Sequence, residues 1–304
     1  MQPSSDGCIF YGIFPGMAHR IAQELMQMRC AWKELLSILP GWMRQPVDEL
    51  GSTTLQELRL RRGQPPELIR ANGNMEVRKT VTEEDLRYVV NTASRYSPWA
   101  SATVARGYIT AVGGHRIGLC GETVVQGDVM TGIRRVDSLC IRIARDIRGI
   151  ADSLRAYHGS ILVIGPPGYG KTTLLRDLIR IRAREDTVSV VDERGELFPL
   201  EGGFLRGKRM DVLTGCSKVH GIEMLLRVMG STTIAVDEVT SERDCEALMK
   251  AGWCGVSLLA TAHAATVEDL VNRPVYKPLV RSGLFETAVV LRRDKSWKVE
   301  EIRT

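Results

Sequence analysis

The stretch from Ser160 to Leu178 restricts the fold more than any other part of this sequence. An apolar run, Ile161–Ile164, leads directly into a glycine-rich segment, and leucines at helical spacing follow that segment. The segment fits the pattern G-x-x-x-x-G-K-[ST] in full, and the residues expected to bind phosphate are Gly165, Pro166, Pro167, Gly168, Tyr169, Gly170, Lys171, Thr172 and Thr173. A chance glycine-rich turn is the weaker interpretation, because a strand precedes the pattern and a helix follows it.

A loop of this kind binds nucleotide triphosphates for a physical reason. The free N–H groups and the positive dipole end of the following helix point into one concavity. Glycines let the backbone approach the phosphates closely. Lys171 would reach the β- and γ-phosphates, and the Thr172 hydroxyl would ligate Mg²⁺. The sequence therefore predicts binding of ATP or GTP together with Mg²⁺.

A second strand, 233–236, ends in two carboxylates, Asp237 and Glu238. Asp237 is placed to hold the metal ion or its water shell, and Glu238 to polarise a water for attack on the γ-phosphorus. Two acidic residues at a strand end also arise by chance. After a complete phosphate loop, however, they favour hydrolysis of the nucleotide over phosphoryl transfer to a small acceptor.

Two further strand ends carry candidate residues. The strand 187–191 runs into the acidic segment Asp192–Glu196, in which Glu193 is a candidate catalytic residue, and a solvated turn is the alternative. The strand 256–261 runs into His263, which should lie at the same sheet edge. His263 or Thr261 would bond the γ-phosphate and respond to hydrolysis. A buried or capping histidine is the competing interpretation.

From residue 160 onward, strands alternate with helices, which is typical of a parallel sheet covered on both faces. Helices are expected at 171–183, 241–252 and 266–273, and a hairpin of 288–292 with 297–302 should close the chain. This gives an α/β domain over residues 151–304, with ligands at the carboxyl ends of its strands.

The preceding part reads as a smaller α+β domain over residues 31–150. Helices are expected at 31–39 and from Thr82, a good N-cap, to about 96. Strands are expected at 55–60, 67–70, 75–80, 108–112, 115–120, 123–126 and 139–144. Residues 1–30 form a poorly defined extension, and Met26 or Met28 could be the true start.

Composition excludes some classes of protein. The 41 Lys and Arg against 36 Asp and Glu give a net charge of +5, which suits nucleic acid or an anionic membrane but decides neither. Seven cysteines without a C-x-x-C pair indicate a reducing compartment, and the five histidines make no metal site with them. Without a run of about 18 apolar residues or a signal peptide, the expected location is cytoplasmic.

The four strand-end blocks, in this order, resemble the traffic ATPases of type II and type IV secretion systems, which are relatives of the RecA and AAA+ ATPases. Further segments are similar to the stage III sporulation protein AA family of endospore-forming bacteria, namely Leu35–Pro40, Leu55–Arg62, Gly113–Gly118 and Val191–Leu197. The resemblance covers residues 31–304 and is most specific in the second half.

The resemblance implies a RecA-like P-loop NTPase domain that assembles as a ring.

 It further implies a hexameric ATPase that uses ATP, resides in the mother cell and works with membrane proteins of a channel into the forespore. The resemblance thus implies a cytoplasmic protein that is held at the membrane by its partners. It also implies that arginines of the N-terminal domain reach the nucleotide. Arg116 and Arg142 lie on the matching strands, where a surface charge is the alternative. The four-cysteine zinc insertion of some type II relatives is absent from this sequence.

The leading prediction is an ATP-hydrolysing mechanochemical ATPase. One alternative is a RecA-like motor stimulated by nucleic acid. Aromatic residues make up only 6% of the chain and are not interleaved with the arginines, which speaks against that alternative. The other alternative is a nucleotide-gated scaffold, against which the intact Asp237-Glu238 pair argues.

Overall fold

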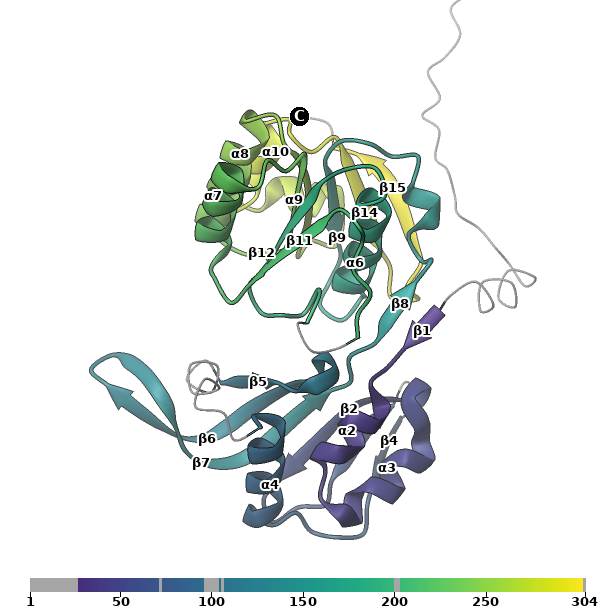
Figure 1. Ribbon diagram of the computed structural model, residues 1–304, viewed down its shortest axis with the longest axis vertical. Coiled ribbons are helices and arrows are strands. Elements are labelled where there is room, and N and C mark those ends of the chain that lie inside the picture. The colour runs from purple at the N-terminus through teal and green to yellow at the C-terminus, as the bar shows by residue number, and fades with distance from the viewer. Residues whose placement is uncertain (1–26, 71–72, 96–103, 105–106, 200–202, 303–304) are drawn as a thin grey trace, which may run out of the picture. The chain divides into compact units, whose positions relative to one another are not determined.

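The computed structural model describes residues 27–70, 73–95, 104, 107–199 and 203–302. The chain forms two compact units (Figure 1). Of the described residues, unit 1 takes residue 27 and those within 147–198 and 205–302, and unit 2 takes those within 28–146 together with 199, 203 and 204. Nearly all of the predicted N-terminal extension lies outside the described residues. In the described part of the chain, every helix is too short or too polar to cross a bilayer.

Unit 1 is built on a seven-stranded sheet with the order β11-β10-β12-β13-β9-β14-β15. All neighbouring strands pair in parallel except β14 and β15, which form an antiparallel hairpin. The strands are β9 (Ile161–Ile164), β10 (Val188–Asp192), β11 (Met210–Thr214), β12 (Thr233–Val239), β13 (Ser257–Ala262), β14 (Thr287–Leu291) and β15 (Trp297–Glu301).

Helices cover both faces of this sheet because alternate residues of its strands are apolar on both sides. Leu162 and Ile164 belong to one core cluster, whereas Ile161 and Val163 belong to another. Figure 1 shows α6 on one side and α7, α8 and α10 on the other. The helices are α6 (Lys171–Arg182), α7 (Lys218–Val228), α8 (Glu242–Trp253), α9 (Val267–Asn272) and α10 (Lys277–Arg281), with a 3₁₀ turn at Asp152–Leu154.

Unit 2 contains a six-stranded antiparallel sheet with the order β4-β3-β2-β7-β6-β5. Its strands are β2 (Leu55–Arg61), β3 (Glu67–Arg70), β4 (Gly73–Glu76), β5 (Tyr108–Thr110), β6 (Arg116–Gln126) and β7 (Val129–Arg142). The helices α2 (Trp32–Ile38), α3 (Gly41–Thr54) and α4 (Glu83–Ala93) supply apolar residues to the core of this unit. A short pair of strands, β1 (Gln27–Arg29) and β8 (Asp146–Arg148), lies at the sequence boundaries of the units.

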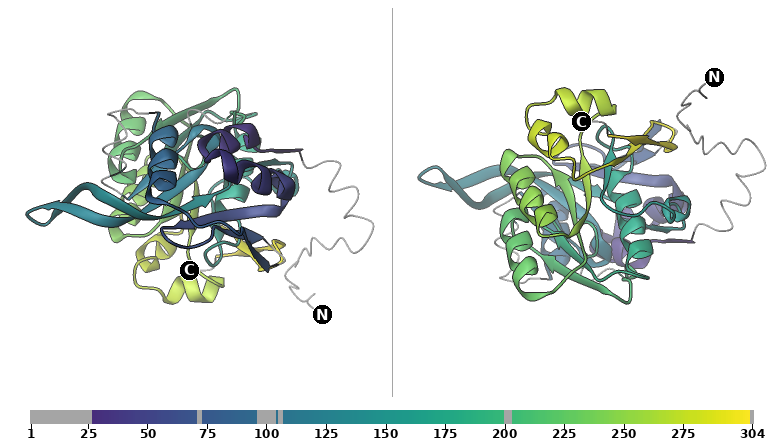
Figure 2. Two further views of the ribbon diagram at one scale, coloured as in Figure 1. Left: turned by 90° about the horizontal axis from the view of Figure 1, so that it is seen from below. Right: turned by 90° about the horizontal axis from the view of Figure 1, so that it is seen from above.

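The hairpin of β6 and β7 differs from the sequence prediction. Gly121 was expected to separate two strands at 115–120 and 123–126, but β6 is continuous and its pairing with β7 shifts register there. A Cβ on Gly121 would lie 1.9 Å from the Arg135 carbonyl oxygen, so this glycine permits a bulge and not a break. The outer part of the hairpin forms a two-stranded ribbon (Figure 2).

Several elements were missed by the sequence analysis. The helix predicted at 31–39 is confirmed as α2, which ends before Pro40-Gly41, but the helix α3 that begins at Gly41 was not predicted. The predicted strand 139–144 is only the last part of β7. The strand β11 and the helix α7 were not predicted either. The capping expectation at Thr82 is confirmed in full, because Thr82 and Asp85 bond each other's backbone N–H groups.

One loop of unit 2 holds three chain segments together. His115 is fully buried, with its Nε2 2.9 Å from the Ala31 carbonyl oxygen, and its Nδ1 accepts a bond from the Ala144 N–H. Burial lowers the pKa of His115 despite the bond to Ala31. A Cβ on Gly114 would lie 2.5 Å from Pro199 Cγ, so a glycine is needed where Pro199 packs.

Candidate active site

The four sequence blocks meet at one edge of the unit 1 sheet. Strands β10, β12, β13 and β9 are consecutive neighbours and run in parallel, so their carboxyl ends lie at the same edge. The acidic segment follows β10, Asp237 and Glu238 end β12, His263 follows β13, and the phosphate loop follows β9. The fold therefore assembles residues that lie almost 100 positions apart in the chain.

The phosphate loop has the backbone that its glycines allow. Gly168 and Gly170 have φ values of +77° and +99°, in the left-handed region that favours glycine. A Cβ on Gly168 would meet nothing within 4 Å, and one on Gly170 would meet only the end of Lys295, at 4.0 Å. The space beside Gly168 and Gly170 is thus open, and α6 begins directly after them, at Lys171.

Lys171 is folded into this loop. Its Nζ donates to the carbonyl oxygens of Gly165 and Pro166 at 2.8 and 3.1 Å and lies 3.1 Å from His263 Nδ1. Burial lowers the pKa of Lys171, and the nearby Asp237 and Glu238 oppose that shift. The hydrogen-bond partners of this buried lysine are therefore two backbone carbonyl oxygens and an imidazole nitrogen.

Asp237 links the phosphate loop to β13. The Thr172 hydroxyl donates to one oxygen of Asp237 at 2.7 Å, and the buried Thr261 hydroxyl donates to the other at 2.6 Å. Thr261 also accepts the backbone N–H of Glu238 at 2.8 Å. One threonine thus fixes the positions of both carboxylate residues.

Glu238 is held in an unusual conformation. Its φ is +54°, and the pairing of β12 with β13 is interrupted between Val236 and Val239. One carboxylate oxygen lies 3.0 Å from His263 Nε2, and the other pairs with Arg194. Burial alone would raise the pKa of Glu238, but the bond from His263 and the charge of Arg194 together lower it.

These contacts form one continuous chain across the sheet edge. An ammonium group can only donate a hydrogen bond, so Nδ1 of His263 accepts the bond from Lys171. The other ring nitrogen, Nε2, then donates to Glu238. His263 is fixed from a second side, since its backbone N–H donates to the hydroxyl of Tyr276. The chain Lys171–His263–Glu238–Arg194 therefore connects the phosphate loop with the acidic segment.

The acidic segment is anchored by Asp192. This buried carboxylate accepts the backbone N–H groups of Glu196, Leu197 and Phe198 at 2.8 to 2.9 Å. Burial raises the pKa of Asp192 more than these bonds lower it. Arg176 of α6 donates to the carbonyl oxygens of Glu196 and Leu197, which ties the same loop to the helix after the phosphate loop.

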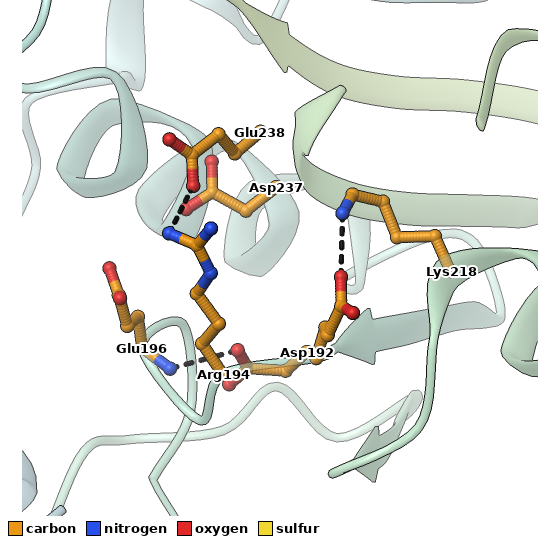
Figure 3. Close-up of a pocket in the computed structure, with 7 residues that line it drawn as sticks. Asp192, Arg194, Glu196, Lys218, Asp237 and Glu238 are labelled. Atoms are coloured by element: carbon orange, nitrogen blue, oxygen red, sulfur yellow. Dashed lines mark hydrogen bonds and ion pairs between the residues drawn. The ribbon is translucent and has the colours of Figure 1, made fainter. Parts of the chain in front are cut away.

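A pocket lies between the acidic segment and the end of β12 (Figure 3). Its lining combines acidic side chains with two cations and consists of Asp192, Glu193, Arg194, Glu196, Lys218, Asp237 and Glu238. Lys218, the first residue of α7, bonds Glu193 at 2.6 Å and lies 3.8 Å from Asp244. Its side chain is only 8% exposed. Glu193, a predicted catalytic residue, is thus paired with a buried lysine.

Sequence reasoning missed three basic residues at this edge. Arg194 and Lys218 line the pocket, and Lys295, in the β14–β15 turn, donates to the Gly168 carbonyl oxygen of the phosphate loop. Arg194 could have been found from the sequence, because it is the only basic residue inside the acidic segment. The other two become visible only once α7 and the hairpin are placed.

Arg116 and Arg142 belong to unit 2. The Arg116 guanidinium stacks on the Tyr108 ring, 4.5 Å from its centroid, and Arg142 lies 3.8 Å from Glu57 with its side chain 68% exposed. Their action on a nucleotide stays a prediction. Within the described residues, no group of three or more His, Cys, Asp or Glu side chains could hold a metal ion by itself.

Solved structures define the class of fold. The chain is similar to the pilus retraction motor PilT, solved with bound ADP, with a TM-score of 0.58 and 15% identity over 86% of this chain and 82% of that one. It is also similar to the ATPase DotB of Legionella pneumophila, with a TM-score of 0.50 and 15% identity over 86% of this chain and 79% of that one. The fold is therefore that of the secretion ATPases, a RecA-like P-loop domain with a preceding α+β domain, which confirms the predicted fold class.

Sequence comparison defines the family. The family described as "Sporulation stage III, protein AA" matches residues 31–303. The stage III sporulation protein AA of Bacillus subtilis (strain 168) is 34% identical over 284 residues, which cover 86% of this chain and 91% of that protein. The chain belongs to the stage III sporulation protein AA family, and the predicted resemblance is confirmed.

Proposed function

We propose that the protein is a mechanochemical ATPase that hydrolyses ATP to ADP and phosphate. The observation that carries the proposal is the chain of contacts from Lys171 through His263 to Glu238, next to the Thr172–Asp237 bond. A lysine in a phosphate loop and a glutamate at the end of the adjoining strand supply the two functions that hydrolysis needs, which are phosphate binding and water activation.

The residues of the loop Gly165–Thr173 would bind the phosphates through their N–H groups and Lys171. The Thr172 hydroxyl and the Asp237 carboxylate are oxygen ligands of the kind that Mg²⁺ takes, and they lie close enough to serve one ion, which would neutralise phosphate charge. An ion held by so few protein ligands takes the rest from phosphate and water, which suits a metal that arrives with its nucleotide.

Glu238 would accept a proton from the attacking water. His263 would hold the carboxylate in place and exchange partners as the phosphate state changes. Glu193, paired with Lys218, would stabilise the pocket wall opposite.

We further propose that the protein acts as a ring, as a homo-hexamer. In such a ring Arg116 and Arg142 would supply positive charge to the γ-phosphoryl group, an effect of about 10³- to 10⁵-fold in related systems. Membership of the family supports a role in sporulation, in powering or assembling a channel between mother cell and forespore. The protein would then lie in the cytoplasm, held at the membrane by channel proteins.

The test is ATP turnover per subunit, measured against protein concentration for the parent protein and for Glu238→Gln. We expect a specific rate that rises with concentration in the parent and falls by about 10²- to 10⁴-fold in the variant, because the general base is removed. Glu246→Gln, on the exposed side of α8, is the matched control and should keep the parental rate.

A rate that does not change with concentration would contradict the ring. Parental turnover in Glu238→Gln would contradict the role of Glu238. Binding of ATP without turnover at any concentration would favour a nucleotide-gated scaffold. Stimulation by nucleic acid that is lost steeply with added salt would favour a nucleic-acid motor.

A further inference from the structure

We propose that Arg194 detects the γ-phosphate of a triphosphate that is bound to the same subunit. Its guanidinium pairs either with Glu238 or with that γ-phosphate. The two pairings exclude each other, so the triphosphate that binds also frees the base that hydrolyses it. This inference rests on the proposed ATPase function and deepens it, because it assigns a positioning role to a residue of the acidic segment.

The backbone around Arg194 is fixed. Asp192 and Gly195 close a turn, with the Gly195 N–H bonded to the Asp192 carbonyl oxygen at 3.2 Å and a φ of +66° at Gly195. The Asp192 side chain holds the next three N–H groups, as described above. Arg194 thus projects from a rigid turn at the end of β10 toward the end of the neighbouring strand β12 (Figure 3).

Glu238 has both carboxylate oxygens engaged, one by His263 and the other by Arg194. A general base must accept a proton from a bound water, so it needs a free and sufficiently basic oxygen. The lowered pKa of Glu238 shows that its partners weaken it as a base. One of the two partners therefore has to leave before Glu238 can act on water.

Arg194 is the partner that is free to leave. His263 is held by Lys171 and by Tyr276, whereas the pair with Glu238 is the ion pair found for Arg194 in the described part of the chain. The Arg194 side chain is 46% exposed. The other cation of the pocket, Lys218, is 8% exposed and already engaged by Glu193. Of the two cations that line the pocket, Arg194 is therefore the more exposed one and the one paired with Glu238.

A γ-phosphate is the competitor that this geometry favours. The planar guanidinium pairs with phosphate as well as with carboxylate, often through two parallel hydrogen bonds. Arg194 is separated from the lysine of the phosphate loop by only two side chains, Glu238 and His263. A diphosphate lacks the group that would compete for Arg194, so the exchange distinguishes ATP from ADP.

The experiment measures the dissociation constants of ADP and of a non-hydrolysable ATP analogue, each with Mg²⁺, by titration calorimetry on the full chain. The variants are Arg194→Gln, Arg194→Lys, Glu238→Gln and the double variant Arg194→Gln/Glu238→Gln. The matched control is Arg273→Gln, which removes an arginine from an ion pair with Asp269 on α9. Thermal unfolding of every variant checks that it is folded.

We expect Arg194→Gln to weaken binding of the ATP analogue by roughly 10- to 100-fold, as for loss of a charged hydrogen bond, and to change ADP binding less than about twofold. Arg194→Lys should retain part of the parent's preference for the ATP analogue over ADP, and Arg273→Gln should bind both nucleotides as the parent does. Glu238→Gln should tighten binding of the ATP analogue, and by clearly less when Arg194 is also replaced.

Equal losses for both nucleotides in Arg194→Gln would overturn the inference, because a merely structural residue behaves in that way. An equal gain from Glu238→Gln in both backgrounds would overturn it too. In these two cases the parent still binds and hydrolyses ATP, so the proposed function stands. A parent protein that binds neither nucleotide would instead contradict the proposed function and the inference together.

Discussion

At the scale of single residues, the site depends on a glutamate whose backbone is under strain. A left-handed conformation costs a residue with a side chain about 1–3 kcal/mol, and Glu238 adopts one at +54°. The Thr261 hydroxyl offsets that cost by accepting the Glu238 N–H, and it also donates to Asp237. The position of both carboxylates therefore depends on one hydroxyl group.

We expect Thr261→Val to lower kcat for ATP by at least tenfold with little change in KM. The substitution keeps the shape of the side chain but removes both hydrogen bonds, which should also reduce the free energy of unfolding by about 1–3 kcal/mol. Steady-state kinetics and urea unfolding measure the two effects.

Thr233→Val is the matched control, because Thr233 is equally buried and lies at the other end of β12, where its hydroxyl donates to Asp186. It should lose stability but keep the parental kcat. Equal kcat values in the two variants would show that Thr261 serves only the stability of the sheet.

Sequence patterns predicted which residues gather at the site but not how they pair. The phosphate loop, Asp237, Glu238 and His263 each follow an apolar strand, and the parallel sheet brings those strand ends together. The pairs Arg194–Glu238 and Lys218–Glu193 depend on β10 being the neighbour of β12 and on α7 starting beside it. Strand order and helix placement are tertiary properties that no local pattern contains.

At the scale of elements, glycines have two opposite structural roles in this chain. Glycines in the phosphate loop keep space open, whereas Gly121 allows the backbones of β6 and β7 to come close. A sequence pattern cannot separate a strand break from a bulge, since both place a glycine between apolar runs. The short strand β11 was missed for a different reason, because all of its residues are only half-buried.

We expect Gly121→Ala to destabilise unit 2 by about 1–3 kcal/mol, as for an overpacked site, because the added Cβ would meet backbone atoms that cannot move alone. Gly132→Ala is the control on the opposite strand of the same hairpin, where a Cβ would meet nothing within 4 Å. Urea unfolding followed by circular dichroism compares the two. Equal stability of both variants would mean that the ribbon adjusts at no cost.

At the scale of the whole molecule, the chain contains separate hydrophobic cores. One cluster lies entirely in unit 2, and two others flank the sheet of unit 1. A ligand that binds to one unit should therefore raise the free energy of unfolding of that unit and leave that of the other unit unchanged.

We expect two calorimetric unfolding transitions, of which only the one belonging to unit 1 is stabilised by ADP and Mg²⁺. At 100 times the dissociation constant the gain is about 2.7 kcal/mol. Leu58→Ala and Leu258→Ala assign the transitions, because each removes a fully buried leucine from a different unit at a cost of about 2–5 kcal/mol. A single transition that shifts as a whole would contradict the prediction.

The path of the chain between the units has a mechanical consequence. The acidic segment and Phe198 belong to unit 1, the next residues, 199–204, belong to unit 2, and the chain then returns. Asp192 and Arg176 hold the loop as far as Phe198, and the next residue, Pro199, packs on Gly114. The units are thus joined by more than one covalent crossing, and one crossing begins six residues beyond Asp192. Because the backbone is continuous, any shift of Pro199 has to be taken up within the few residues that join it to the turn of Arg194.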